Sequence, residues 1–169
     1  MLARLIVNFG LLCGAINVSA EVYQGNTISI HDGDTITLQT SSDTKKVRLA
    51  GIDAPELKQP YGIESRDALK QDILNQAVTV ETTKQDKYGR SVGKIIFNGV
   101  DINLKQVSRG MAWVYTDYLK ELTNEDQQLY LAAQGSAQEA LSGLWKEESP
   151  LAPWTFRKSL VKGYRNDGQ

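Results

Sequence analysis

The chain has 169 residues, of which 41% are hydrophobic and 23% are charged. These proportions are ordinary for a globular protein, so they exclude a globally disordered chain, and the length suffices for one domain with a hydrophobic core. The single cysteine and the single histidine exclude an internal disulfide, a multi-histidine metal site and an acid–base pair of histidines.

Residues 1–20 have the layout of a secretory signal peptide. Arg4 provides a basic start, an apolar run covers residues 5–16, and Val18-Ser19-Ala20 has the small-x-small pattern that signal peptidase reads. The run is too short for a helix that crosses a bilayer, which needs about 20 apolar residues. We therefore expect cleavage after Ala20, a secreted or periplasmic protein, and no membrane association after cleavage.

The charge of the expected mature chain is slightly negative. Loss of Arg4 reduces the Lys and Arg count from 19 to 18 against 20 Asp and Glu, a net charge of −2. A protein that binds nucleic acid over a long footprint usually carries a basic surface. The balance therefore argues against such a protein, but it permits a hydrolase that grips one or two phosphates.

The first half of the expected mature chain predicts three short strands. Hydrophobic and polar residues alternate over 27–30, 35–38 and 46–49, as in half-buried strands. In the third segment Val47 and Leu49 face one way and Arg48 the other. The tight turns between these segments favour a meander, and His31 is interpreted as a solvated residue of the first turn.

The second half mixes helices with strands. A helix is predicted from about Glu64 to Asn75, with Leu69 and Ile73 on its inner face, and strands are predicted over 78–82 and 92–97. Asp101 is expected to cap a helix that carries Leu104 and Val107 inward and stops at Gly110. A last helix follows Thr123 and ends near Gly143, and its small and apolar residues recur at steps of four: Leu129, Ala133, Ala137 and Leu141.

These elements predict an α+β domain with a mainly β core, namely a five-stranded OB-type barrel with about three packed helices. We expect this domain to occupy residues 21–146. Residues 147–169 show no clear period, so we interpret them as a partly ordered or flexible tail that lies partly against the body. We expect the protein to be a monomer.

Acidic residues cluster where the predicted strands end. Asp32 and Asp34 share one turn, and Asp53 and Glu56 directly follow the third strand. Carboxylate oxygens gathered at loop ends suit Ca²⁺. The Asp32 turn does not continue as an EF-hand loop, because Thr37 stands where that loop needs glycine. Any Ca²⁺ is therefore expected to be held by acids from separate loops.

Two arginines accompany these acids. Arg48 lies on the outer face of its strand, and Arg90 closes the turn that begins at Asp86. A guanidinium presents a planar fork that matches two phosphate oxygens, and it stays charged. Taken singly, each feature is more typical of a turn, a loop or a surface ion pair. Together they suit phosphodiester hydrolysis, in which fixed positive groups stabilise the charge that develops on phosphoryl oxygens.

The combination resembles the staphylococcal nuclease family. Three blocks carry the resemblance: Asp32–Thr35, Val47–Leu49 with Gly51–Glu56, and Asp86–Arg90. Weaker matches continue through Asn103-Leu104, Arg109–Ala112 and Leu144-Trp145, so the likeness spans roughly residues 25–146.

The resemblance implies an OB-type barrel and a Ca²⁺-dependent, sugar-non-specific endonuclease. Such an enzyme attacks the phosphodiester of DNA or RNA with water, cleaves the P–O5′ bond and releases 3′-phosphate products. Three positions match the family's catalytic residues: Arg48, Glu56 and Arg90. Three match its Ca²⁺ ligands: Asp34, Asp53 and the carbonyl oxygen of Ala54. Asp32 would lie near the metal without binding it directly. Lys87 and Tyr88 would contact phosphate, and Tyr115 and Tyr118 are candidates for stacking on a base.

Two departures from the family pattern bear on this interpretation. Ala54 replaces a common threonine, but only its carbonyl is needed. Residues 57–59 form a shorter and less basic loop, which predicts weaker binding of nucleic acid. One alternative is a non-catalytic OB-type nucleic-acid-binding module, which would be expected to lack some of the five key charges. Another is a structural envelope domain that binds Ca²⁺ only for stability, which gives no reason for Arg48 and Arg90.

Overall fold

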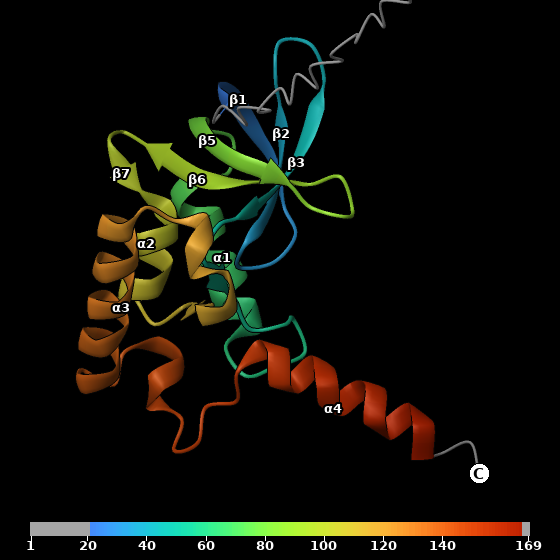
Figure 1. Ribbon diagram of the computed structural model, residues 1–169, viewed down its shortest axis with the longest axis vertical. Helices are drawn as coiled ribbons and strands as arrows, with labels where there is room; N and C mark the ends of the chain where they lie inside the picture. The colour runs from blue at the N-terminus through green and yellow to red at the C-terminus, as the bar shows by residue number, and fades with distance from the viewer. Residues whose placement is uncertain (1–20, 167–169) are drawn as a thin grey trace, which may run out of the picture.

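The structure, a computed structural model, describes residues 21–166, with side chains up to residue 160 and without that of Thr83. Five strands close into a small barrel: β1 (Glu21–Ile30), β2 (Thr35–Gln39), β3 (Thr44–Leu49), β5 (Ala77–Gln85) and β6 (Ser91–Phe97). Neighbouring strands pair antiparallel in the order β3-β2-β1-β5-β6, and a parallel pairing of β3 with β6 completes the ring (Figure 1). The predicted OB-type α+β fold is confirmed.

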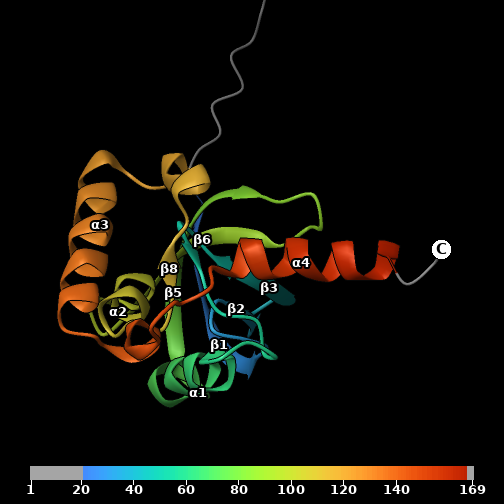
Figure 2. The same ribbon diagram turned by 90° about the horizontal axis from the view of Figure 1, so that it is seen from below.

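Four α-helices accompany the barrel in the described part of the chain: α1 (Gly62–Ile73), α2 (Ile102–Ser108), α3 (Asn124–Glu139) and α4 (Pro153–Asn166). The short strands β4 (Ile52–Asp53) and β8 (Trp113–Val114) pair with each other, and β7 (Val100–Asp101) extends the sheet beside β6. The 3₁₀ turns η1 (Thr116–Glu121) and η2 (Gly143–Lys146) flank α3. In both ribbon views α2 and α3 lie on one side of the barrel, and α4 extends away on the opposite side (Figures 1 and 2).

Alternating residues of the strands fill the barrel. Ile36, Leu38, Val47 and Leu49 are completely or almost completely buried, while Arg48 points out of the core toward the end of β4. This alternation confirms the predicted facing of the third strand. Burial of these branched side chains supplies the main stabilising term of such a core, at roughly 25 cal/mol per Å² of apolar surface.

The helices agree with the sequence in part. Leu69 and Ile73 of α1 are fully buried, as predicted. In α3, Ala137 is buried and Ala133 packs against the core, as predicted, but Leu129 is 48% exposed and Tyr130 is fully buried. Tyr130 tolerates full burial because its hydroxyl donates a 2.8 Å hydrogen bond to Asp101.

The predicted signal segment, residues 1–20, lies outside the described residues. The stretch after residue 146, which shows no period in the sequence, contains the 14-residue helix α4. No helix within residues 21–166 has the length and apolar character needed to cross a bilayer.

Candidate active site

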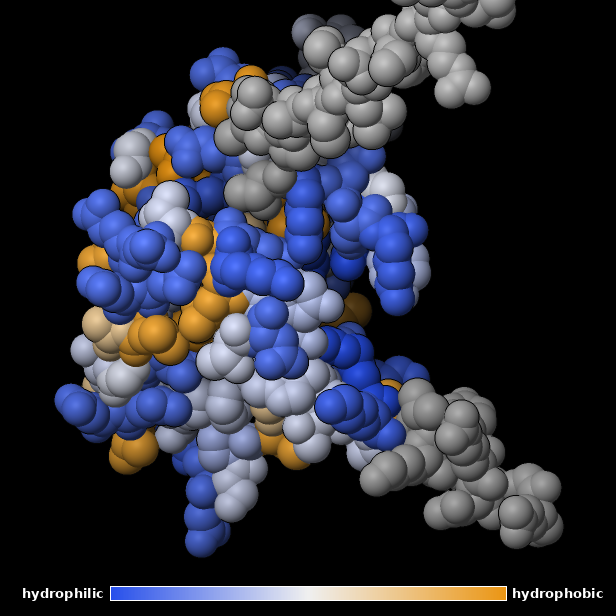
Figure 3. All heavy atoms as spheres, in the orientation of Figure 1, coloured by the Kyte–Doolittle hydropathy of each residue, from blue (hydrophilic) through white to orange (hydrophobic). Residues whose placement is uncertain are grey.

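The predicted site residues meet in one open cleft of about 700 Å³ at the end of the barrel. The β5–β6 turn forms one wall, the loop after β4 forms the floor, and the first turns of α4 form the other wall. The space-filling view shows a hollow with hydrophilic surroundings between the barrel and α4 (Figure 3). The described residues thus offer a polar groove that a chain of phosphates could enter.

The turn between β1 and β2 delivers Asp34 to the cleft. Gly33 is required there, because a Cβ on this residue would collide with the Ser65 hydroxyl on α1. The side chain of Gln106 fixes the turn by donating a 2.9 Å hydrogen bond to the Gly33 carbonyl. Asp34 is consequently held almost fully buried, with Oδ2 accepting from the Ala54 backbone at 2.6 Å.

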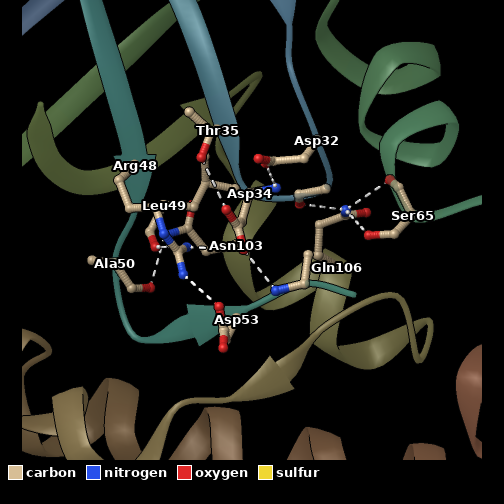
Figure 4. Close-up of polar contacts among 12 residues, drawn as sticks. Asp32, Asp34, Thr35, Arg48, Leu49, Ala50, Asp53, Ser65, Asn103 and Gln106 are labelled. Atoms are coloured by element: carbon tan, nitrogen blue, oxygen red, sulfur yellow. Dashed lines mark hydrogen bonds and ion pairs between the residues drawn. The ribbon is translucent and has the colours of Figure 1, made fainter. Parts of the chain in front are cut away.

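Arg48 joins the two buried aspartates. Its Nη1 lies 3.1 Å from Asp34 Oδ2, and its Nη2 lies 2.9 Å from Asp53 Oδ1 (Figure 4). The arginine also donates to the Leu49 carbonyl at 3.1 Å. Because the guanidinium is planar and held at three points, Arg48 is a rigid group rather than a mobile surface cation.

Asp53 and Glu56 lie on the loop that follows β4. Asp53 is 1% exposed, whereas Glu56 is half-buried and reaches the open part of the cleft. Arg157 of α4 contacts both: its Nη2 lies 2.8 Å from Asp53 Oδ2, and its Nη1 lies 2.8 Å from Glu56 Oε1. Arg157 is thus a third arginine of the site, which the sequence analysis did not single out, and it bridges two of the predicted site residues.

Asp86 builds the turn that presents Arg90. Its carboxylate accepts from the backbone N–H groups of Tyr88 and Arg90 at 2.9 and 3.0 Å and from Arg90 Nε at 2.6 Å. These hydrogen bonds outweigh the effect of burial and hold the pKa of Asp86 below its usual value. Among the described residues Arg90 has no other acidic partner, so its two terminal nitrogens are available to the cleft.

The acids of the cleft are electrostatically crowded. Burial and the nearby charge of Asp34 raise the pKa of Asp32 to about 7. Burial also raises the pKa of Asp53, and hydrogen bonds from Arg157 together with the charge of Arg48 oppose that rise. Such crowding is typical of a site built to receive a cation.

Asp34 and Asp53 can each contribute an oxygen to a divalent ion. Three contacts occupy Asp34, from Thr35, Ala54 and Arg48, and three occupy Asp53, all from Arg48 and Arg157. An ionised carboxylate has about four acceptor positions, so each aspartate keeps one for a metal. No group of three acidic, His or Cys side chains within residues 21–166 could enclose an ion. The residues thus fit a hard cation that takes its other ligands from carbonyl oxygen, water and phosphate.

The aromatic candidates occupy the far rim of the cleft. Tyr115 is stacked on Trp154 of α4, with ring centroids 5.1 Å apart and an interplanar angle of 2°, so one of its faces is covered. Tyr118, 4.6 Å from Tyr115, is 41% exposed, and Tyr88 is 72% exposed. Tyr118 and Tyr88 therefore have the freer faces for a base.

Every site residue predicted from the sequence lies at a strand end, in the loop that follows a strand or at the rim around Tyr115, and all of them line the same cleft. Sequence reasoning missed four further residues: Lys84, Glu121, Gln59 and Arg157. Lys84 and Glu121 form a 2.5 Å ion pair at the rim. No local pattern links Arg157 to Glu56, which lies 101 residues earlier.

Comparisons with known proteins point in one direction. Residues 46–147 match a family model described as staphylococcal nuclease homologue. The chain is 35% identical over 157 residues to a protein of Escherichia coli O157:H7 named an uncharacterized endonuclease, which covers 92% of this chain and 94% of that protein. It is 34% identical over 146 residues to a micrococcal nuclease of Shigella flexneri, covering 81% of this chain and 82% of that protein. A Haemophilus influenzae protein, also named an uncharacterized endonuclease, is 35% identical over 162 residues, covering 94% of this chain and 88% of that protein.

Proposed function

Because the chain belongs to the staphylococcal nuclease family and is a hydrolase of phosphodiester bonds, we propose that it is a Ca²⁺-dependent, sugar-non-specific endonuclease. Its substrates are DNA and RNA, and its products carry 3′-phosphates. The family relation supports hydrolysis of phosphodiester bonds. The resemblance of the three sequence blocks supports Ca²⁺ as the metal and 3′-phosphates as the product ends.

One observation carries the proposal. Two buried aspartates, a half-buried glutamate and two arginines line a single cleft, and Arg48 fixes the spacing of Asp34 and Asp53 through contacts of 3.1 and 2.9 Å. The cleft is thus preorganised to hold one phosphate between a cation site and two guanidinium groups, which lowers the cost of reorganisation during reaction.

The chain's own groups then account for the chemistry. A bound Ca²⁺ would supply charge that polarises the phosphate, and Asp34, Asp53 and the Ala54 carbonyl would hold it. Glu56 accepts the proton of the attacking water as the water oxygen bonds to phosphorus. Arg48 and Arg90 stabilise the negative charge on the phosphoryl oxygens. The P–O5′ bond breaks, the O5′ atom takes up a proton and leaves as a hydroxyl, and the phosphate stays on the 3′-oxygen of the upstream fragment.

We also propose that the enzyme acts outside the cytoplasm, as a secreted or periplasmic protein. This proposal rests on the layout of residues 1–20 alone. N-terminal sequencing of the protein recovered from an expressing bacterium checks it: a mature end at Glu21 supports export, and a retained Met1 in the cytoplasmic fraction contradicts it.

End-group analysis of reaction products tests the catalytic proposal. Purified residues 21–169 are incubated with a 5′-labelled DNA and an RNA of the same sequence, with Ca²⁺ or with a chelator. We expect internal cuts in both substrates, 3′-phosphate ends that phosphatase removes, and no cutting with chelator. Products with 5′-phosphate ends, or activity that survives chelation, would reject the proposed mechanism.

A further inference from the structure

We propose that Arg157, in the C-terminal helix α4, is a positioning residue of the active site that holds Glu56 in its productive orientation. The inference rests on the proposed function of Glu56. Arg157 lies ten residues beyond the end of the family-model match at residue 147, and α4 is therefore an additional part of this active site.

The contacts of Glu56 are the first observation. Within the described residues, the only hydrogen-bond or ion-pair partner of its carboxylate is Arg157, whose Nη1 lies 2.8 Å from Oε1. The same nitrogen lies 3.2 Å from Asp53 Oδ1, and Nη2 lies 2.8 Å from Asp53 Oδ2. Asp53 is almost completely buried and is held by Arg48. Arg157 therefore links the carboxylate of Glu56 to a carboxylate that is itself held in place.

The backbone of the Glu56 loop is held to the same C-terminal segment by a second, independent contact. Gln59 is 6% exposed, its Oε1 accepts from the Glu56 backbone N–H at 2.9 Å, and its Nε2 donates to the Leu151 carbonyl at 2.9 Å. The C-terminal segment thus restrains both the main chain and the side chain of Glu56.

The start of α4 is anchored firmly enough to serve this purpose. Trp154 stacks on Tyr115 and packs edge-on against Trp113 at 5.6 Å, and Pro153 is buried. Three residues later, less than one helical turn beyond Trp154, the chain presents Arg157 to the cleft. The remainder of α4 extends away from the body (Figure 1), so the helix contributes to the site through its first turns.

Electrostatics favour the same role. Nη1 of Arg157 lies within 3.2 Å of carboxylate oxygens of both Asp53 and Glu56, so without Arg157 the two neighbouring carboxylates would lose the cation between them. Like charges that close repel each other, and we expect Glu56 to rotate toward solvent. A general base must lie within hydrogen-bond reach of its proton, and displacement of a reacting group by about 1 Å can cost roughly 100-fold in rate.

Steady-state kinetics of Arg157→Ala, Arg157→Lys and the matched control Lys158→Ala test the proposal in the full chain. Lys158 is the exposed neighbour of Arg157 on α4. At saturating Ca²⁺ we expect kcat of R157A to fall about 10- to 100-fold, with KM changed much less. R157K should be intermediate, because an ammonium group cannot bridge two carboxylates as a planar fork does. K158A should match the wild type.

Chemical rescue and Ca²⁺ titration separate positioning from other roles. Low millimolar ethylguanidinium should restore part of the kcat of folded R157A and have no effect on the wild type. If instead R157A has the wild-type kcat and needs less Ca²⁺ for half-maximal rate, Arg157 is an inhibitory competitor of the metal and the proposal is wrong. Equal kcat and equal Ca²⁺ dependence would also overturn it. If the wild-type protein shows no Ca²⁺-dependent cleavage, the proposed function is wrong and so is this role of Arg157. The results for R157A described above would overturn only the role of Arg157.

Discussion

Asn103 shows how a single buried side chain stabilises the frame around the cleft. It is fully buried, its Oδ1 accepts from the Ile95 backbone N–H at 3.1 Å, and its Nδ2 donates to the carbonyls of Ala50 and Gly93, each at 3.1 Å. These contacts join α2 to β6 and to the segment between β3 and β4. The sequence marked Asn103 only as part of a weak family match, because a buried amide with three partners leaves no local pattern.

Replacement of Asn103 by alanine should therefore destabilise the protein strongly. The change leaves the Ile95 N–H and the Ala50 carbonyl buried without this partner, at about 1–3 kcal/mol for each unsatisfied group. We expect the free energy of unfolding to fall by about 3 kcal/mol in urea denaturation, while Asn124→Ala, at an exposed position, changes it by less than about 0.5 kcal/mol. A loss below about 1 kcal/mol for N103A would show that this network contributes little.

At the scale of elements, the Asp86–Arg90 turn is a unit that Asp86 holds closed. The carboxylate pairs with Arg90 and with two backbone N–H groups, so its pKa is lower in the folded state than in the unfolded chain. A group with a depressed folded pKa stabilises the protein above its unfolded pKa of about 3.9, and the contribution disappears as the pH falls through the folded pKa. Asp86 is thus stabilising at neutral pH and loses this effect in acid.

Asp86→Asn should consequently reduce the melting temperature at pH 7, and the difference from the wild type should shrink below about pH 4. Differential scanning fluorimetry across pH 3–8 measures this. Asp67→Asn, at a side chain that is 44% exposed, provides the control and should show little difference at any pH. A gap between D86N and wild type that stays constant from pH 7 to pH 3 would contradict the assigned role of the carboxylate.

The strands could be predicted from the sequence more completely than the inner face of α3. The strands were predictable because alternation is local: Val47 and Leu49 must face the core if Arg48 does not. The inner face of α3 was not predictable in the same way. The steps of four through Leu129 suggested one apolar stripe, but the helix buries Tyr130. The hydroxyl of Tyr130 donates a hydrogen bond to Asp101, 29 residues away in the sequence.

The same reasoning explains why the site was predicted in part. Asp34, Asp53, Arg48 and Glu56 stand at strand ends or in short loops after them, so their convergence follows from the strand pattern together with the family resemblance. Arg157 enters the cleft only because Trp154 docks on Tyr115, a tertiary contact between distant segments. Nothing in the spacing of residues 147–169 predicts that contact.

In the molecule as a whole, charges of both signs are concentrated in the cleft, and the chain carries a formal net charge of −1. The cations that line the cleft are Arg48, Lys84, Lys87, Arg90 and Arg157, the acids are Asp32, Asp34, Asp53, Glu56, Asp86 and Glu121, and several of them are paired with one another. This distribution predicts a short electrostatic footprint on nucleic acid. Binding should then depend only modestly on salt, because few counterions are released.

A salt titration measures that footprint. For a fluorescent single-stranded oligonucleotide and the Glu56→Gln variant, we expect log K against log [KCl] to have a slope of about −2 to −3, given about 0.7 per phosphate contact on single strands. Lys87→Ala should make the slope less steep by about 0.7, the contribution of one phosphate contact. Lys70→Ala, at an exposed position on α1, should leave the slope unchanged. A slope steeper than about −6 would indicate a long basic binding surface and would contradict the short footprint.

The most direct test of the convergent cleft is the single-turnover rate of DNA cleavage by Glu56→Gln at saturating Ca²⁺. Glutamine keeps the shape of Glu56 but cannot take a proton, and Glu64→Gln, at an exposed position on α1, provides the matched control. We predict a rate about 100- to 10,000-fold below wild type for E56Q, a wild-type rate for E64Q, and unchanged melting temperatures. Cleavage by folded E56Q at close to the wild-type rate would contradict the role of Glu56 in this cleft.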